Sequence, residues 1–143
     1  MHMDEELLVR QMPHSVEAEQ AVLGSMLIDA RCVPEVIERL RPEDFYLQQN
    51  RDIYETIYSM FNYSMTIDPV TVLDELTSAG YYDEAGGRAY LFQLMDITPG
   101  SRNVAEYVRI VRDKSLLRQL ADAGSEIQQN AISGQGDASG IAE

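Results

Sequence analysis

The sequence predicts an all-α protein, a small multi-helix globular bundle followed by a long helix. Three observations support this fold class. Apolar residues recur at steps of three and four in several successive segments, the spacing of one face of an α-helix. Capping residues precede these segments, and glycine or proline follows them. Residues 102–133 contain no proline and one glycine, so they can form a single helix of about 30 residues.

The composition indicates one soluble domain. A chain of 143 residues, 45% of them hydrophobic, is long enough to bury one core. It has no run of about 18 apolar residues and no signal-peptide pattern, so we expect a cytoplasmic protein without membrane contact. The single cysteine, Cys32, fits a reducing compartment and is expected to be buried beside Val33. The net charge of −13 opposes binding to phosphates, so we expect little autonomous DNA binding.

The segment from Pro13 to Asp29 is the first predicted helix. Ser15 can cap it, and Glu17 and Glu19 follow in the first turn, near the positive end of the helix dipole. Its apolar face consists of Val16, Val22, Leu23, Met26 and Leu27. Gly24, beside this face, permits close approach of another helix. The two glutamates point about 200° apart and cannot act as one acid/base pair. Glu17 faces solvent, whereas Glu19, on the rim of the apolar face, needs an arginine or a backbone amide as partner.

Two helices are predicted next. Pro34 suits the first turn of one helix, which ends before Pro42 and is followed by a turn in "RPEDFY". The other has apolar residues at steps of three and four and stops around Tyr63 or Ser64. Its face consists of Ile53, Tyr54, Ile57, Tyr58 and Phe61. Tyrosines at this spacing are typical of a core rather than of a platform for stacking bases.

Two more helices are predicted before the long one. Asp68 can cap the first, Pro69 begins it and Gly80 ends it. Its apolar face consists of Val72, Leu73 and Leu76. Gly86 and Gly87 lead into the second, "RAYLFQLMDI", and the following "TPG" ends it.

The long helix changes its apolar face along its length. One side of its first half carries Val104, Tyr107, Val108 and Val111. Nearly the opposite side of its second half carries Leu117, Leu120, Gly124, Ile127 and Ala131. We therefore expect the first half to dock on the body, and the second half to protrude and pack on a partner helix.

The predicted domain organisation has four parts. A flexible N-terminal segment (1–12), which begins with residues compatible with cloning, precedes the globular body (13–100). The long helix (101–133) follows. Residues 134–143 read as a loop and the start of a further helix that the chain does not finish, so the chain is expected to be a fragment.

No catalytic, cofactor-binding or metal-binding residues are predicted. A P-loop needs lysine between glycine and serine or threonine, but the only lysine, Lys114, follows Asp113. The only histidines, His2 and His14, stand near the N-terminal end and offer no base to a serine or cysteine nucleophile. Neither HExxH nor ExxH spacing occurs, so the sequence does not indicate a metal site.

Basic residues cluster in the long helix. They are Arg109, Arg112, Lys114 and Arg118. On a helix the first two point one way and the last two nearly the other, with acidic residues between them, so no single basic stripe forms. Weak affinity for DNA or an acidic partner stays open.

Five motifs occur in register: "SVEAEQAVLGSMLID", "RPEDFY", "DPVTVLDEL", "GGRAYL" and "AEYVRIVRDKSLLRQL". In this order they resemble the N-terminal domain of the bacterial replicative DNA helicase (DnaB family), over about residues 13–132. Each motif alone has low specificity, but five in register make the resemblance specific. The chain departs from the family at Asn50, where histidine often precedes the arginine, and at residues 65–67, which are more apolar than the usual loop.

The resemblance implies that the long helix is the first arm of a truncated helical hairpin, whose second arm would begin near residues 137–143. The apolar residues of its second half would then form the hairpin seam. In the family, hairpins pair neighbouring subunits, so that six N-terminal domains build a collar, a trimer of dimers, above the ATPase ring. Without the second arm, we expect weak or rearranged dimerisation.

The resemblance also implies partners. The collar recruits the C-terminal domain of primase, and a helicase loader is a further candidate. Candidate docking residues for primase are Arg109, Arg112 and Arg118. ATP and Mg belong to a C-terminal ATPase domain that this sequence lacks, in agreement with the missing P-loop. The fragment itself is therefore expected to be neither an enzyme nor a cofactor-binding protein.

Alternatives to this interpretation are a generic helical protein-interaction adaptor and a DNA-binding regulator of the helix-turn-helix type. The regulator needs a short helix with exposed basic side chains, whereas the best-capped helix, Pro69–Ala79, carries Asp74 and Glu75. An enzyme is the last alternative, because no nucleophile, base and orienting group can be assembled.

Overall fold

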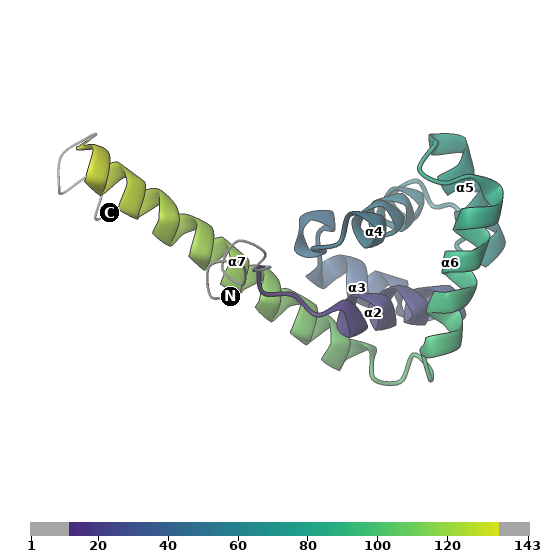
Figure 1. Cartoon of the computed structure of the whole chain (residues 1–143). Helices are drawn as coiled ribbons and strands as arrows, with labels where there is room; N and C mark the ends of the chain where they lie inside the picture. Colours follow the sequence, from purple (N-terminus) through teal and green to yellow (C-terminus); the bar gives the residue numbers. More distant parts are fainter. Residues whose placement is uncertain (1–11, 135–143) are drawn as a thin grey trace, which may run out of the picture.

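The structure, a computed structural model, describes residues 12–134, which form helices joined by short loops (Figure 1). The α-helices are α2 (Val16–Ile28), α3 (Val33–Arg39), α4 (Gln48–Asn62), α5 (Pro69–Ala79), α6 (Glu84–Ile97) and α7 (Val104–Ser133). Two short 3₁₀ helices are η1 (Ala30–Cys32) and η2 (Pro42–Asp44). The described residues contain no strand, so the all-α prediction is confirmed. The predicted start of a second arm, near residues 137–143, and nearly all of the predicted N-terminal segment lie outside the described residues.

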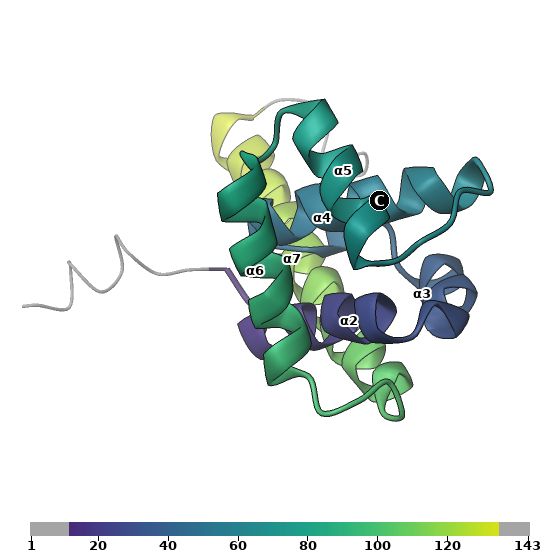
Figure 2. The ribbon, with the colours of Figure 1, turned by 90° about the vertical axis from the view of Figure 1, so that its right-hand side faces the viewer.

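Helix α2 is the central helix of the body and packs against α4, α6 and α7 (Figure 2). Ser15 caps it as predicted, since its hydroxyl accepts a hydrogen bond from the Ala18 amide at 3.2 Å. The prediction of one apolar face was too narrow, because all six residues from 22 to 27 are buried. Two of these, Gly24 and Ser25, are not hydrophobic and gave no signal in the apolar pattern.

Gly24 allows α6 to approach α2 closely, as predicted. A Cβ atom at this position would lie 2.0 Å from Thr98 Oγ1 and 2.5 Å from the Leu94 carbonyl oxygen. These distances are far below van der Waals contact, so the crossing of the two helices needs glycine here.

The tyrosines of α4 belong to the core, as predicted. Tyr54 is fully buried, and its hydroxyl donates to the carbonyl oxygens of Leu40 at 2.8 Å and Val36 at 3.3 Å. Its ring stacks on Phe45, with 4.6 Å between the centroids. Both bonds reach the end of α3, so Tyr54 fixes α3 on α4 while leaving no buried polar atom without a partner.

Helix α5 has the predicted ends. The Asp68 carboxylate accepts from the Thr71 amide at 2.9 Å, Pro69 begins the helix, and Gly80 ends it with φ of 81°. Helix α6 begins earlier than predicted, at Glu84, because the Asp83 carboxylate caps it. Gly86 and Gly87 therefore lie inside its first turns. The helix ends at Ile97, where the "TPG" stop was predicted.

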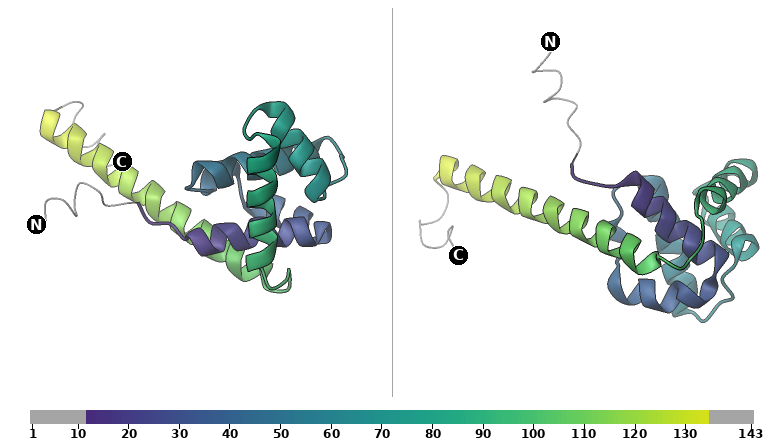
Figure 3. Two further views of the ribbon diagram at one scale, coloured as in Figure 1. Left: turned by 45° about the vertical axis from the view of Figure 1, so that its right-hand side comes forward. Right: turned by 90° about the horizontal axis from the view of Figure 1, so that it is seen from below.

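Helix α7 is the predicted long helix, with 30 residues and a length of about 45 Å. Its first half docks on the body through Val104, Val108, Val111 and Ser115, which are all buried. Its second half extends away from the body (Figure 3). The helix ends at Gly134, which has a φ of 70°. The predicted docking of one half and protrusion of the other are confirmed.

Candidate interaction surface

The arm, defined here as residues 116–133 of α7, extends away from the body (Figure 3), and no described residue covers its apolar side. The predicted seam residues all lie on this exposed side: Leu117, Leu120, Gly124, Ile127 and Ala131. Leu120 keeps 68% of its surface exposed and Ile127 keeps 50%. The opposite side of the arm is polar and carries Gln119, Asp122, Glu126 and Gln129. An amphipathic helix without a partner is typical of an interface.

The seam follows a seven-residue repeat. Leu117, Gly124 and Ala131 are spaced by seven, and Leu120 and Ile127 lie between them, as in the a and d positions of a coiled coil. No atom lies within 4 Å of the position that a Cβ of Gly124 would take. Small residues between large ones allow a second helix to approach closely. The use of these residues as a seam stays a prediction.

A junction of polar side chains joins η2 to α7 where the arm begins. The Asp44 carboxylate, only 2% exposed, accepts from the Ser115 hydroxyl at 2.7 Å and from Arg112 Nη1 at 3.3 Å. Its other oxygen accepts from the Arg41 amide at 2.7 Å. A buried carboxylate with three donors is well satisfied, so Asp44 fixes the last docked turn of α7 on the body.

Arg118 extends the junction into the first turn of the arm. Its guanidinium donates to the carbonyl oxygens of Asp44 at 2.7 Å and Pro13 at 2.9 Å. It also lies over the Tyr46 ring, 5.3 Å from the centroid, and the His14 ring stacks on the same tyrosine at 4.4 Å. The chain preceding α2, the η2 loop and the arm are thereby held together.

The predicted separation of Arg112 from Arg118 was wrong, because both reach Asp44. Positions on a helical projection describe where side chains start, and both arginines are long enough to bend toward a loop between them. Ser115, midway between the two, marks the side of α7 on which that loop lies. Two of the three candidate docking residues are therefore engaged within the chain.

Arg109, the third candidate, lies on the surface. Its guanidinium contacts Glu106 at 2.7 Å and Asp113 at 3.0 Å. The hydrogen bond that Arg109 donates to Glu106, together with the charges of both carboxylates, raises the pKa of Arg109 above its usual value. The positive charge is thus balanced locally, and the docking role of all three arginines stays a prediction.

Glu19 lies in the core rather than on its rim. It is 1% exposed, and its carboxylate accepts from the Tyr46 amide at 2.7 Å, the Leu47 amide at 3.3 Å and Asn50 Nδ2 at 2.9 Å. The predicted backbone-amide partner is confirmed, but the sequence analysis missed Asn50. The Tyr90 hydroxyl donates to the Asn50 side-chain oxygen and extends this network to α6. Glu19 therefore holds α2 to the start of α4.

The loops near η1 hold two further side chains of interest. Cys32 is half-buried rather than buried, and desolvation, with nearby Asp29 and Glu35, raises the pKa of its thiol to about 11.

The Asp29 carboxylate accepts from the Arg31 side chain at 2.9 Å and from the Ser101 hydroxyl at 3.0 Å. The Arg31 side-chain bond is the main cause that lowers the pKa of Asp29 to about 2. This carboxylate ties the end of α2 to the loop that leads into α7.

Residues 12–134 offer no cluster of histidine, cysteine and acidic side chains that could hold a metal ion. Nor is any helix in this range both long and apolar enough to cross a membrane. The features described above are surfaces and structural contacts, and the arm with its junction is the main candidate for binding another protein.

Known proteins resemble this chain over most of its length. The family described as "DnaB-like helicase N terminal domain" matches residues 11–113. The replicative DNA helicase DnaB of Leifsonia xyli subsp. xyli is 38% identical over 128 residues, 90% of this chain. That of Haemophilus influenzae is 40% identical over 124 residues, 87% of this chain. The chain spans about a quarter of these relatives, 28% and 26% of their lengths.

A solved structure matches the fold. It is the crystal structure of the N-terminal domain of DnaB helicase from Mycobacterium tuberculosis, with a TM-score of 0.84 and 36% sequence identity. The match covers 92% of this chain and 93% of that one, so it includes part of the arm as well as the body.

Proposed function

The chain belongs to the family of DnaB-like helicase N-terminal domains, and from this premise we propose that it is the collar domain of a hexameric replicative DNA helicase. The domain assembles subunits and docks other replication proteins in the cytoplasm, and it performs no catalysis. ATP hydrolysis with Mg and movement along DNA belong to the part of a full-length helicase that this chain does not cover. The observation that carries this proposal is the uncovered apolar side of the arm.

Subunits pair through the seam of the arm. Burial of apolar surface contributes about 25 cal/mol per Å², so the exposed leucine and isoleucine side chains favour a partner helix. The polar side, with Asp122 and Glu126, stays in water. Such pairing of neighbouring domains gives the dimers from which a trimer of dimers, and so a six-domain collar, is built.

Primase docks through its C-terminal domain on α7 and its junction with the body, and a helicase loader is a further partner. Arg109 is exposed and supplies a direct contact. Arg112 and Arg118 act differently, because their bonds to Asp44 hold the arm at a fixed angle to the body. The net charge of −13 disfavours DNA as a direct ligand of this domain.

The seam is tested by the double variant Leu120→Asp/Ile127→Asp. Two carboxylates on the apolar side should abolish self-association of the chain, and hexamer assembly of the full-length protein, in analytical ultracentrifugation. The matched control is Gln119→Asp/Gln129→Asp, which adds the same charge to the polar side and should leave assembly unchanged. Equal assembly by both double variants would remove the seam from the proposal.

Primase docking is tested by calorimetric titration with the primase C-terminal domain of the same organism. Arg109→Glu should weaken binding about tenfold if its contact is direct, a loss of about 1.4 kcal/mol. Arg39→Glu, an exposed arginine on α3, serves as a control for the change of charge. Absence of any heat of binding, for this chain and for the full-length protein, would contradict docking on this domain.

A further inference from the structure

A hollow of about 410 Å³ lies where α3, η2, α4 and the docked half of α7 meet. We call it the arginine hollow, because Arg39 of α3, Arg41 before η2 and Arg112 of α7 all line it. Its other lining residues include Leu40 and Tyr58, which are apolar or aromatic, and Glu38 and Asp44, which are acidic. A volume of this size is typical of pockets that bind small molecules.

Two of the three arginines have no bond within the fold. Arg112 donates to the Asp44 carboxylate at 3.3 Å. Arg39 and Arg41 are exposed, and neither guanidinium forms a hydrogen bond or an ion pair with any residue in the range 12–134. The Asp44 carboxylate already accepts from the Ser115 hydroxyl and from a backbone amide, so it does not need a further guanidinium. Both arginines are therefore available to a ligand.

Stabilisation of α3 accounts for only one of these arginines. Arg39 lies in the last turn of α3, where a positive charge interacts favourably with the helix dipole. Arg41 lies beyond the end of that helix, and Arg112 belongs to another helix. The dipole of α3 thus does not explain why three guanidinium groups line one hollow.

The arginine hollow is locally positive on an acidic chain. Three arginines line it against the two carboxylates of Glu38 and Asp44, whereas the whole chain has a net charge of −13. A long polyanion such as DNA would extend beyond the hollow and be repelled by the excess of acidic residues elsewhere. A small anion can instead lie within the positive region, so its size favours it as the occupant.

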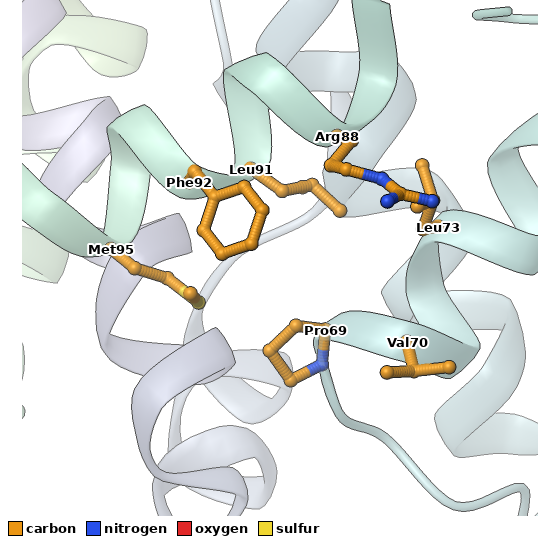
Figure 4. A pocket seen from close by; sticks show the side chains of 7 residues that line it. All are labelled: Pro69, Val70, Leu73, Arg88, Leu91, Phe92 and Met95. Atoms are coloured by element: carbon orange, nitrogen blue, oxygen red, sulfur yellow. The ribbon is translucent and has the colours of Figure 1, made fainter. Parts of the chain in front are cut away.

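The hollow between α5 and α6 provides a contrast (Figure 4). One arginine, Arg88, lines it, and the other lining residues are all apolar: Pro69, Val70, Leu73, Leu91, Phe92 and Met95. Several guanidinium groups are gathered only in the arginine hollow among the hollows found in residues 12–134. The cluster is therefore a particular feature of the place where α3 meets α7.

The number of donors favours linked phosphate groups. Each guanidinium can form two parallel bonds to a carboxylate or a phosphate, so three of them offer roughly six donors. Arg112 uses one of these for Asp44. A carboxylate has two acceptor oxygens, whereas a phosphate group has about three. Two linked phosphates therefore satisfy the cluster better than one acidic side chain does.

We propose that the arginine hollow binds the linked phosphate groups of a small molecule, either free pyrophosphate or the diphosphate of a nucleotide. Arg39 and Arg41 hold the phosphates together with the remaining N–H groups of Arg112. The half-buried ring of Tyr58 offers a contact to the rest of a nucleotide. Because Arg112 also donates to Asp44, the ligand contacts a residue that holds α7 on the body.

The test is calorimetric titration of the chain, at low ionic strength, with pyrophosphate, ADP, adenosine and the peptide triglutamate. Pyrophosphate and ADP should bind, whereas adenosine and triglutamate should not. The sequence has no P-loop, so binding of ADP would not be due to one. Equal affinities for pyrophosphate and ADP would assign the site to free polyphosphate, and a higher affinity for ADP would assign it to a nucleotide.

Arginine variants locate the site. Arg39→Gln/Arg41→Gln should weaken binding of pyrophosphate about tenfold or more, because two of the three guanidinium groups are lost. The fold should be retained, since neither side chain bonds to another residue within 12–134, and circular dichroism checks this. The matched control is Arg102→Gln/Lys114→Gln, which removes the same charge outside the hollow and should leave the affinity unchanged.

The acidic residue of the hollow gives a test with the opposite sign. Glu38→Gln removes a carboxylate from the lining and should strengthen binding of pyrophosphate about threefold. Glu35→Gln, on the same helix but outside the lining, should change it little.

Three results would overturn the proposal. Absence of pyrophosphate binding at millimolar concentration would remove the site. Equal losses in the two double variants would show that only the overall charge matters. Binding of triglutamate as tight as that of pyrophosphate would make an acidic protein segment the occupant.

Discussion

The two halves of α7 are one continuous helix, yet their apolar residues lie on opposite sides. From Val104 to Ser115 the helix rests on the body with its valines inside, whereas from Leu116 to Ser133 its leucines and isoleucines face outward. The side that is buried in the first half continues along the arm as polar residues. A helix is thus maintained by its backbone bonds over its whole length, while one half lies against the body and the other half is exposed.

The docked half of α7 is expected to affect the stability of the fold, and the arm is expected to affect the assembly of subunits. The first half completes the core, and Ser115, the last buried residue within 12–134, comes two residues after the end of the family match at residue 113. None of the apolar residues of the arm is buried, so folding of the body does not account for its apolar side. Changes in the two halves should therefore have effects of different kinds.

The largest expected effect comes from a charge placed in the docked half. Val108→Asp puts a carboxylate where the side chain is 2% exposed, and we expect a loss of at least about 3 kcal/mol in the free energy of unfolding. Leu120→Asp, the same kind of change in the arm, should alter it by no more than about 0.5 kcal/mol. Urea denaturation followed by circular dichroism measures both. Similar losses would show that the arm contributes to the core.

The next effect is expected at the junction between the halves. Asp44→Ala leaves Ser115 and Arg112 without their acceptor, and should cost about 3 kcal/mol. Asp113→Ala, which removes an exposed partner of Arg109, should cost less than about 0.5 kcal/mol. Thermal unfolding of the two variants gives the comparison. If the junction only orients the arm, Asp44→Ala will unfold like the wild type.

A smaller effect should distinguish two glycines. Gly24→Ala forces a Cβ against α6 and should destabilise the chain by about 1–3 kcal/mol. Gly124→Ala in the arm meets no neighbour and should increase helicity, because alanine favours a helix over glycine by about 1 kcal/mol. Far-UV circular dichroism with urea titration measures both. A loss of stability in Gly124→Ala would mean that the arm is packed within the single chain.

The smallest effect is a pH dependence at the start of the docked half. The Arg31 bond holds the pKa of Asp29 at about 2, below its ordinary value of 3.8. Because the folded-state pKa is lowered, the stabilisation is present above about pH 4 and is lost as the pH falls toward 2. Asp29→Asn should therefore show a shallower loss of stability between about pH 4 and 2 in thermal unfolding. An unchanged slope would mean that the lowered pKa of Asp29 does not contribute to stability.

Tertiary structure decided which polar residues lie inside. The sequence predicts that Glu19 lies at the rim of the apolar face of its helix. In the structure it is buried, and its carboxylate accepts hydrogen bonds from Asn50 and from two backbone amides of a distant loop. Asp44 reads as part of a turn, yet it receives bonds from residues about 70 positions later in the chain. No local pattern predicts such pairs, because each depends on a loop being brought against a helix by packing elsewhere.

Local patterns predicted most of the α-helices, and they predicted that one half of the long helix docks on the body while the other protrudes. The caps at Ser15, Asp68 and Gly80 act within a few residues, and the change of face along α7 follows from the spacing of its apolar residues. The packing of distant segments brings Arg112 to the Asp44 carboxylate and Arg118 to the Asp44 carbonyl oxygen, and it leaves a groove between α5 and α6. Periodicity fixes the direction in which a side chain leaves its helix, but what it meets there is set by the packing of segments far apart in the sequence.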